Sequence, residues 1–394
     1  CLQYTFDNQN LTDGDTLVYC LYTQAGLTAF SSQTVNKFQE FLINMRLPDI
    51  ETKIMGIQVV LSDIKLNDFD APQTQFEFLQ NLIVAKIVDL QINFVFQFRV
   101  VQQIYPYISD FGTGKMNLDT DFILEGYPQT VESCRHHINF NAQRVQVDIH
   151  SLRIKMSGKF EFIYDALLVP LASLLKQMLN DELQKQFTQN LIDLVNSQLS
   201  NTVYLTPTDS AYFCDQRLIA FQVDASFLRI QSANQMVLRE SSAVFRHWLF
   251  TEKRPQPQLV TNDHIQYQIR REVFQSCLNA YQRTFLGAKF GNLSFTALRF
   301  AKTGLLVQIS GDFEAKVLFK VTSEKKFNTE YSIDTRFVLN FQQIVENEEA
   351  ISVAQHIHEN RYKIVAAYTI SNCESERCKV IYINENWIEV ACNY

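Results

Sequence analysis

The sequence predicts an α+β protein in which long antiparallel strands pack against long amphipathic helices. Residues 90–100, LQINFVFQFRV, alternate apolar and polar side chains almost without interruption, which is typical of a half-buried strand. Residues 57–70 also alternate, but they shift phase between Leu61 and Ile64, as a strand does at a β-bulge. From Pro170 to about residue 200, apolar side chains recur every three or four residues. This spacing predicts an amphipathic helix that starts at a proline and is about as long as the strands.

The composition indicates a globular protein with wide apolar interiors. Of the 394 residues, 46% are hydrophobic and 20% are charged, and 31 are Phe and 16 are Tyr. These values exclude a disordered chain, and the length has room for two or three domains. No apolar run approaches the ~18 residues that a transmembrane helix needs.

Charge argues against a nucleic-acid partner. The formal net charge is −7, and residues 1–216 hold 14 Lys and Arg against 24 Asp and Glu, which gives −10 for that part. Binding to phosphates requires a basic face. For the same reason we expect weak attraction to an anionic bacterial surface, so endotoxin is not an expected partner.

Other elements follow from the same patterns. A helix is predicted at 27–45, ending before Pro48. A polar turn that contains glycine is predicted at 109–115, and a strand is predicted at 119–126. In 143–163 the apolar positions change phase after Ile149. Apolar residues four apart predict a second helix after Asn262 and Asp263; they are Ile265, Ile269, Val273, Cys277 and Tyr281. Strands are predicted at 313–321, 331–341, 362–370 and 379–390.

Cysteines and sequons favour the secretory pathway. The sequence starts at Cys1, which suggests a removed leader, and it holds an even count of eight cysteines. Asn10 and Asn292 each begin an acceptor sequon for N-glycosylation. Together these features predict an extracellular or luminal protein with disulfides. A cytosolic protein with buried thiols and a lipoprotein lipidated at Cys1 remain as alternatives.

Patterns typical of enzymes and metal sites are weak. His136, His137 and His150 lack accompanying ligands at zinc-like spacing, and Asp119 and Asp121 resemble solvated loop acids. We find no glycine-rich phosphate loop and no GxSxG elbow. The sequence therefore predicts no catalytic residue, no metal ligand and no cofactor.

Two stretches resemble the tubular lipid-binding superfamily, and in particular its bactericidal/permeability-increasing, lipopolysaccharide-binding and lipid-transfer proteins. INMRLPDIETKIMGIQVVLSDIKLNDF, with Pro48 and Asp49, is similar to the junction between helix and strand in that family. ESCRHHINFNAQRVQVDIHSLRIKMSG, followed by the long helix, is similar to the next family segment. The resemblance covers about 25–205 well and 217–320 more thinly.

The resemblance implies an elongated two-domain fold with twisted sheets wrapped around long helices, the second domain being shortened. It divides the chain into an N-terminal lipid-binding domain at 1–215, connecting strands of a central sheet at 216–250, and a C-terminal domain at 251–394. It also implies an apolar tube that holds a phospholipid-like acyl lipid as ligand, since burying each CH₂ is worth about 0.8 kcal/mol. The residues expected to line the tube are Phe38, Leu42, Leu90, Ile92, Phe94, Phe96, Phe98, Leu175, Met178 and Leu179. The alternative for these residues is that they simply fill a core.

The resemblance fails at one disulfide and near the C-terminus. The family pairs the cysteine that matches Cys134 with one on the long helix, where this sequence has none. We therefore expect Cys134 with Cys214, Cys373 with Cys378 and Cys1 with Cys20, which leaves Cys277 with Cys392. Residues 345–394 lack the family's late helix, so an uncovered strand edge there is a possible docking surface for proteins. Beside a lipid carrier that contacts lipid or a membrane surface, the sequence thus allows a structural or adhesion glycoprotein.

Overall fold

The computed structural model describes residues 16–29, 43, 47–70, 74–105, 107–131, 134–159, 161–200, 204–207, 212–238, 258, 262–281, 293–301, 304–311, 315–320, 332–334, 338–339, 343–344 and 378–393. The chain forms two compact units. Unit 1 comprises residues 1–26, 130–137 and 201–394, and unit 2 comprises 27–129 and 138–200. This division joins the first 26 residues to the C-terminal part; the domain boundaries expected at 215 and 250 stay predictions.

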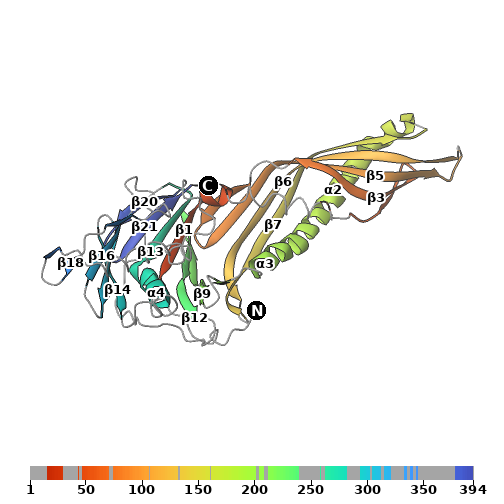
Figure 1. Ribbon diagram of the computed structural model, residues 1–394. Helices are drawn as coiled ribbons and strands as arrows, with labels where there is room; N and C mark the ends of the chain where they lie inside the picture. The colour runs from red at the N-terminus through yellow and green to blue at the C-terminus, as the bar shows by residue number, and fades with distance from the viewer. Residues whose placement is uncertain are drawn as a thin grey trace. The chain divides into compact units, whose positions relative to one another are not determined.

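Unit 2 is an antiparallel sheet covered by a long helix (Figure 1). The strand order is β2-β3-β5-β6-β7, with β4 also paired to β5. Its elements are β2 (Ile50–Ile54), β3 (Ile57–Asp70), β4 (Gln75–Leu79), β5 (Leu82–Gln102), β6 (Ile108–Val131), β7 (Cys134–Ser157, whose first residues lie in unit 1), α2 (Glu161–Gln186), the π-helical turn η2 (Phe187–Leu191) and α3 (Ile192–Ser200). The predicted fold class is confirmed.

Both predicted phase shifts are confirmed. The register of β3 against β5 shifts between Ser62 and Lys65, where Asp63 has a positive φ of 52°. In β7, burial passes from the positions around Val147 to the opposite parity at Leu152–Met156. A second bulge that the sequence did not reveal lies in β5 at Asp89, φ 59°, whose N–H donates to Asp121 Oδ1 at 2.9 Å. Bulges increase the local twist, which lets strands of this length curl along a helix.

The turn predicted at 109–115 is wrong, because these residues belong to β6. Gly112 and Gly114 lie directly opposite Phe98 and Phe96 of β5. A Cβ at Gly114 would fall 2.2 Å from Phe96 Cζ, and one at Gly112 would fall 2.2 Å from the Ser157 carbonyl oxygen. These glycines therefore make room for aromatic rings and neighbouring backbone inside a sheet.

The long helix starts earlier than predicted. α2 begins at Glu161, so Pro170 lies inside it and not in its first turn. Leu167 and Leu171 on either side of the proline are at most 1% exposed. Tertiary packing of this kind supplies most helix stability in proteins and holds the helix across the missing backbone hydrogen bond.

Unit 1 is built on a six-stranded antiparallel sheet in the order β10-β11-β1-β13-β21-β20, which joins the start and the end of the described chain. The elements of this sheet are β1 (Val18–Thr23), β10 (Leu218–Val223), β11 (Phe227–Ser232), β13 (Ile265–Arg270), β20 (Cys378–Ile383) and β21 (Trp387–Cys392). The others are β8 (Leu205–Pro207), β9 (Tyr212–Asp215), β12 (Gln235–Leu238), α4 (Arg271–Tyr281), β14 (Ser294–Ala301), β15 (Gly304–Ser310), β16 (Ala315–Lys320), β17 (Ser332–Asp334), β18 (Val338–Leu339) and β19 (Gln343–Ile344).

The helix predicted after Asn262 and Asp263 is confirmed only in its second half. Residues 265–270 form β13, and α4 starts only at Arg271. A spacing of four residues fits a helix face, but it also fits a strand face, because four is a multiple of two. The strand predicted at 379–390 is a hairpin, β20 and β21. Most of the helix at 27–45 and the strand at 362–370 lie outside the described residues.

Candidate functional site

The apolar interior of unit 2 lies between β5 and the long helix. Along β5, Leu90, Ile92, Phe94, Phe96 and Phe98 are each at most 3% exposed, so the predicted alternation is confirmed. The ring of Phe98 packs edge-on against Tyr164 of α2, with 5.1 Å between ring centroids. Because side chains on alternate positions share one face of a strand, this row forms one wall of the interior.

A stripe of leucines on α2 forms the facing wall. Leu171, Leu175, Leu179 and Leu183 are at most 1% exposed. Each step of four residues turns about 40° beyond one full helical turn, so the stripe winds around the helix. The wider π-helical turn η2 begins at Phe187 and offsets this winding, so that Phe187 and Leu191 at its two ends are both buried.

The predicted placement of Met178 in this wall is wrong. Met178 is 40% exposed, because it precedes the buried stripe by one position at Leu179. Seven of the ten predicted residues belong to one buried cluster, and Phe38 and Leu42 lie outside the described residues. The seven are Leu90, Ile92, Phe94, Phe96, Phe98, Leu175 and Leu179.

A buried carboxylate closes one end of this interior. Asp110, 3% exposed, accepts hydrogen bonds from the Tyr164 hydroxyl, from the Lys159 N–H at 2.8 Å and from the Phe111 N–H at 2.9 Å. Burying a carboxylate is costly unless its oxygens are hydrogen-bonded. Three donors meet that requirement and fix the start of α2 to β6.

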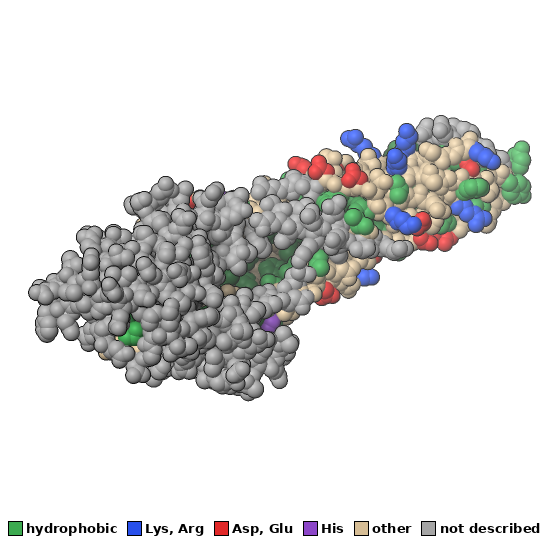
Figure 2. All heavy atoms as spheres, in the orientation of Figure 1, with side chains coloured by type: hydrophobic (Ala, Val, Ile, Leu, Met, Phe, Trp, Pro, Cys, Tyr) green, Lys and Arg blue, Asp and Glu red, His purple; other side chains and the backbone are tan. Residues whose placement is uncertain are grey.

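The opposite end is formed by contacts between β7 and α3. Phe140 and Ala142 of β7 and Ile192 and Leu194 of α3 are only partly buried where they pack against the cluster. The Asn196 side chain bonds the Phe140 backbone twice, accepting from its N–H at 2.7 Å and donating to its carbonyl at 3.2 Å. Figure 2 shows hydrophobic side chains near the place where Figure 1 has α3 and β7. The Asn196 side chain therefore joins α3 to β7 at this end of the interior.

A polar groove of about 370 Å³ lies on the outside of unit 2, between β7 and α2. Lys176 in this groove donates to the His150 carbonyl at 3.3 Å. No cluster of three or more potential metal-ligating side chains occurs in the part of the chain that the structure describes. The groove is lined by Asp148, Ile149, Ser173, Lys176, Gln177, Asn180 and Asp181.

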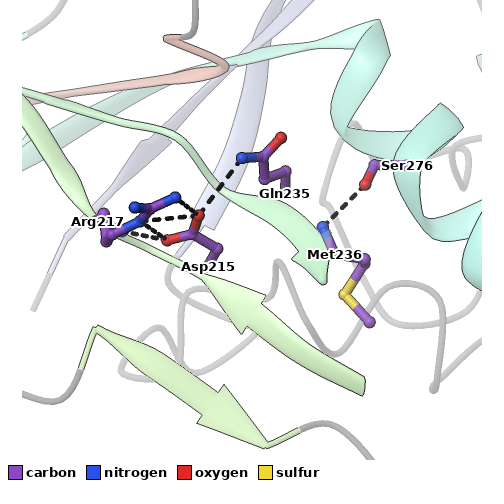
Figure 3. Close-up of polar contacts among 5 residues, drawn as sticks. All are labelled: Asp215, Arg217, Gln235, Met236 and Ser276. Carbon is purple, nitrogen blue, oxygen red and sulfur yellow. Dashed lines mark hydrogen bonds and ion pairs between the residues drawn. The ribbon is translucent and has the colours of Figure 1, made fainter. Parts of the chain in front are cut away.

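Unit 1 contains a buried ion pair (Figure 3). Arg217, 2% exposed, donates to both carboxylate oxygens of Asp215 at 2.8–3.0 Å, and Gln235 Nε2 lies 3.4 Å from Asp215 Oδ2. Beside it, the Met236 N–H donates to Ser276 Oγ of α4 at 2.8 Å. The bidentate geometry satisfies both charges, so these contacts link β9, β12 and α4.

Two predicted disulfides are wrong. Cys20 and Cys214 are buried thiols, so the pairs with Cys1 and Cys134 do not form in this structure. Burial raises the pKa of both thiols to about 12, which makes them poor nucleophiles. Cys392 is disulfide-bonded. The predicted pair of Cys373 with Cys378 stays a prediction, and the sequons at Asn10 and Asn292 lie outside the described residues.

Sequence reasoning missed three residues that shape this interior: Asp110, Tyr164 and Asn196. Each is a single polar or aromatic residue whose partner lies 49 to 56 positions away in the sequence. Of the three, only Asn196 had a feature in the sequence that could have suggested a contact, because it is an amide on the polar side of an amphipathic helix. No periodicity marks such a contact, because its partner is backbone on another element. Among the described residues, no helix is both long and apolar enough to cross a membrane.

Known proteins resemble this chain in sequence or in fold. Residues 26–207 match the model of the LBP / BPI / CETP family, N-terminal domain. The crystal structure of lipopolysaccharide binding protein superposes with a TM-score of 0.60 at 12% identity, covering 96% of this chain and 98% of that one. Takeout 1 of Epiphyas postvittana gives a TM-score of 0.31 at 14% identity, over 45% and 91% of the two chains. P47 of Clostridium botulinum E1 gives 0.28 at 10% identity, over 96% and 99%. No curated protein matches the sequence.

Proposed function

We propose that the chain binds lipid without catalysis, because residues 26–207 match the model of the LBP / BPI / CETP family, N-terminal domain. The fold is that of the tubular lipid-binding superfamily. The observation that supports a lipid ligand is the continuous apolar interior between β5, β6 and α2. Among the described residues of unit 2, Asp110 is the buried ionisable side chain, and it lies at one end of this interior.

The ligand is a phospholipid or a similar acyl lipid that enters at the α3 end. There Phe140, Ala142, Ile192 and Leu194 are only partly buried, whereas the stripe from Leu171 to Leu183 is fully packed. An acyl chain that covers these side chains gains about 0.8 kcal/mol for each CH₂ removed from water. Its head group stays at the surface, where polar side chains and water solvate it.

The proposed location is the extracellular space or the lumen of the secretory pathway. The disulfide at Cys392 supports it, because disulfides persist mainly in oxidising compartments.

Native mass spectrometry of protein from its own source, followed by organic extraction, tests the proposal. We expect one or more bound masses that disappear on denaturation and resolve into acyl lipids. Ala142→Trp, which places a large ring at the half-buried end, should abolish the bound mass. Ala220→Trp, a half-buried alanine on β10 of unit 1, is the matched control and should keep it. A clean apo mass for the unmodified protein contradicts lipid carriage.

An apo mass would favour a second function, that of a structural or adhesion glycoprotein. The observation behind it is the edge strand β20, on which Tyr382 is 51% exposed. An edge strand can pair with a strand of another chain. Self-association that a Tyr382→Ser variant weakens would support this function.

A further inference from the structure

The last residue of β21, Cys392, forms a disulfide. Cys392 is 0% exposed and lies on the same face of β21 as Ile388 and Val390, which are each 1% exposed. Cys20 and Cys214 are free thiols, so neither is its partner. The partner is therefore one of the five other cysteines of the chain, which are Cys1, Cys134, Cys277, Cys373 and Cys378.

Strand register places one of these five next to Cys392. β20 and β21 form an antiparallel hairpin, in which Cys378 lies directly opposite Cys392, and Figure 1 shows the two strands side by side. Residues that lie directly opposite each other in an antiparallel pair share one face of the sheet, with Cβ atoms about 4.5–5.5 Å apart. The register therefore brings Cys378 and Cys392 together.

Backbone hydrogen bonds show how Cys392 is oriented within the sheet. The Trp387 carbonyl accepts from the Asn384 N–H within the hairpin at 3.0 Å. On the other side of the strand, the Asn386 carbonyl accepts from the N–H of Arg271, the residue after β13, at 2.9 Å. The register of β21 against β13 is continuous from Trp387 to Cys392, so successive residues direct their backbone groups to alternate neighbours. Trp387 faces β20, and Cys392, five positions later, therefore faces β13.

It follows that Cys378 and Cys392 form a non-hydrogen-bonded pair between β20 and β21. In such a pair the two Cα atoms are about 4.5 Å apart, and a disulfide requires a Cα separation of about 4.4–6.8 Å. The bond therefore fits without displacing either strand. The register shift in the hairpin lies between Val380 and Tyr382 of β20 and leaves the orientation of β21 unchanged.

We propose that a disulfide joins Cys378 to Cys392 and fastens the edge strand of the six-stranded sheet in unit 1. β20 is the last strand in that sheet, and among the described strands it pairs with β21 alone. An edge strand opens more readily than a central one, because neighbouring strands hold it on one side only. A covalent bond at its first residue restricts this opening and limits the conformations of the unfolded hairpin.

Cys20, a free thiol in the same sheet, does not compete for this bond. It lies on β1 opposite Tyr267 of β13, which in turn lies opposite Val390 of β21. Two strand spacings of about 4.8 Å therefore separate Cys20 from β21. Burial raises the pKa of its thiol to about 12, so almost no thiolate is present at neutral pH. Because the thiolate is the species that attacks a disulfide, Cys20 does not exchange with the bond.

Peptide mapping of the full chain under non-reducing conditions tests the proposal. Free thiols are first alkylated, and the protein is then digested with trypsin, which cleaves after Arg377 and Lys379. The two cysteines then fall on different peptides, 378–379 and 380–394. We expect these two peptides to be linked, and the link to disappear on reduction.

The pairs predicted from the sequence, Cys373 with Cys378 and Cys277 with Cys392, are the competing assignments. Each of these four cysteines lies on a tryptic peptide of its own. The proposal is wrong if the Cys392 peptide is linked to that of Cys277. It is equally wrong if the Cys378 peptide is linked to that of Cys373.

Cys378→Ser gives a second test. Loss of its partner should leave Cys392 as a thiol, which iodoacetamide labels in denaturant, whereas Cys392 of the unmodified chain should stay unlabelled. Cys373→Ser is the matched control and should also leave Cys392 unlabelled. Absence of the label from Cys392 in Cys378→Ser would contradict the assignment.

Amide hydrogen exchange tests whether the bond fastens the edge. In Cys378→Ser, exchange in β20 should be at least about tenfold faster than in the unmodified chain, because hydrogen bonds alone then hold the strand. Exchange in β10, the opposite edge of the same sheet, should be unchanged. Equal exchange in β20 of the two proteins would refute this role. None of these measurements depends on a lipid in unit 2, so they test the disulfide separately from lipid binding.

Discussion

Glycines in β6 show how single residues adapt the sheet to its aromatic row. A Cβ at Gly114 would meet mainly the ring of Phe96, whereas a Cβ at Gly112 would meet the backbone oxygen of Ser157. A clash with a side chain can be relieved by a smaller residue, but one with a neighbouring strand requires the backbone to move. Both positions therefore require glycine, but Gly114 is required by a side chain and Gly112 by a neighbouring backbone.

We expect Gly112→Ala and Gly114→Ala each to lower the free energy of unfolding by about 1–3 kcal/mol, as overpacking does. The measurement is urea denaturation. Phe96→Leu should recover part of the loss in Gly114→Ala, whereas Phe98→Leu should recover little in Gly112→Ala. Equal recovery in the two double variants would show that the rings alone determine both positions.

His150 gives a pH-dependent prediction at the same scale. Its Nε2 lies 3.0 Å from Asp121 Oδ2, and the hydrogen bond to Asp121, with the charges of Asp119 and Asp148, raises the pKa of His150 above its ordinary 6.5. A raised pKa means that the protonated histidine stabilises the fold at pH below the ordinary value. That contribution is lost as the pH rises through the folded-state pKa.

An NMR titration of the imidazole should give a pKa above 6.5, and Asp121→Asn should return it toward the ordinary value. Lys176→Met, which leaves the Asp121 contact in place, is the control. Because the His150 side chain is 47% exposed, the effect on stability should be small. An unshifted pKa in the unmodified protein would show that the ion pair does not persist in solution.

At the scale of elements, α2 shows how a helical register determines which side chains reach the interior. Leu179 is 1% exposed and Met178, one position earlier, is 40% exposed. Leu179→Ala should therefore lower the free energy of unfolding by about 2–5 kcal/mol, as deletion of a buried leucine does. Met178→Ala should cost less than about 1 kcal/mol, since surface substitutions have small effects. If thermal or urea unfolding shows that both variants lose similar free energies of unfolding, α2 must be rotated about its axis so that Met178 is also buried.

The sequence predicts elements well where one face is buried and the period is unambiguous. The strand at 90–100 and the bulge after Leu61 were predicted because alternation at period two has a visible phase. The strand at 265–270 was not predicted, because a spacing of four residues fits both a helix and a strand. The glycines at 112 and 114 predict a turn, since the sequence cannot show that an aromatic ring on another strand needs the space.

The candidate site was predictable only in part, for a similar reason. Apolar residues such as Phe94 and Leu175 identify the buried faces, but they do not distinguish a packed core from a lipid tube. One end of the interior depends on the contact between Asp110 and Tyr164, and the other on the contact between Asn196 and Phe140. These contacts join elements that are distant in the sequence, so no local sequence pattern predicts them.

At the scale of the whole molecule, a lipid in unit 2 should affect the two units differently. A ligand that binds only the folded state stabilises it by about 2.7 kcal/mol at a concentration one hundred times its dissociation constant. If the lipid sits at the α3 end, its removal should increase amide hydrogen exchange in α3 and in β7 near Phe140. Exchange in β1, β13 and β21 should stay unchanged, because these strands form the separate sheet of unit 1.

Hydrogen-exchange mass spectrometry of native and delipidated protein measures this difference. Ala142→Trp should resemble the delipidated protein in having no bound lipid, but its exchange in α3 should not respond to added lipid. Ala220→Trp should respond as the unmodified protein does. Faster exchange in both units after delipidation would mean that the lipid does not bind at the α3 end. No change in either unit would mean that the apolar interior is a packed core. The function of a structural or adhesion glycoprotein would then be the better explanation.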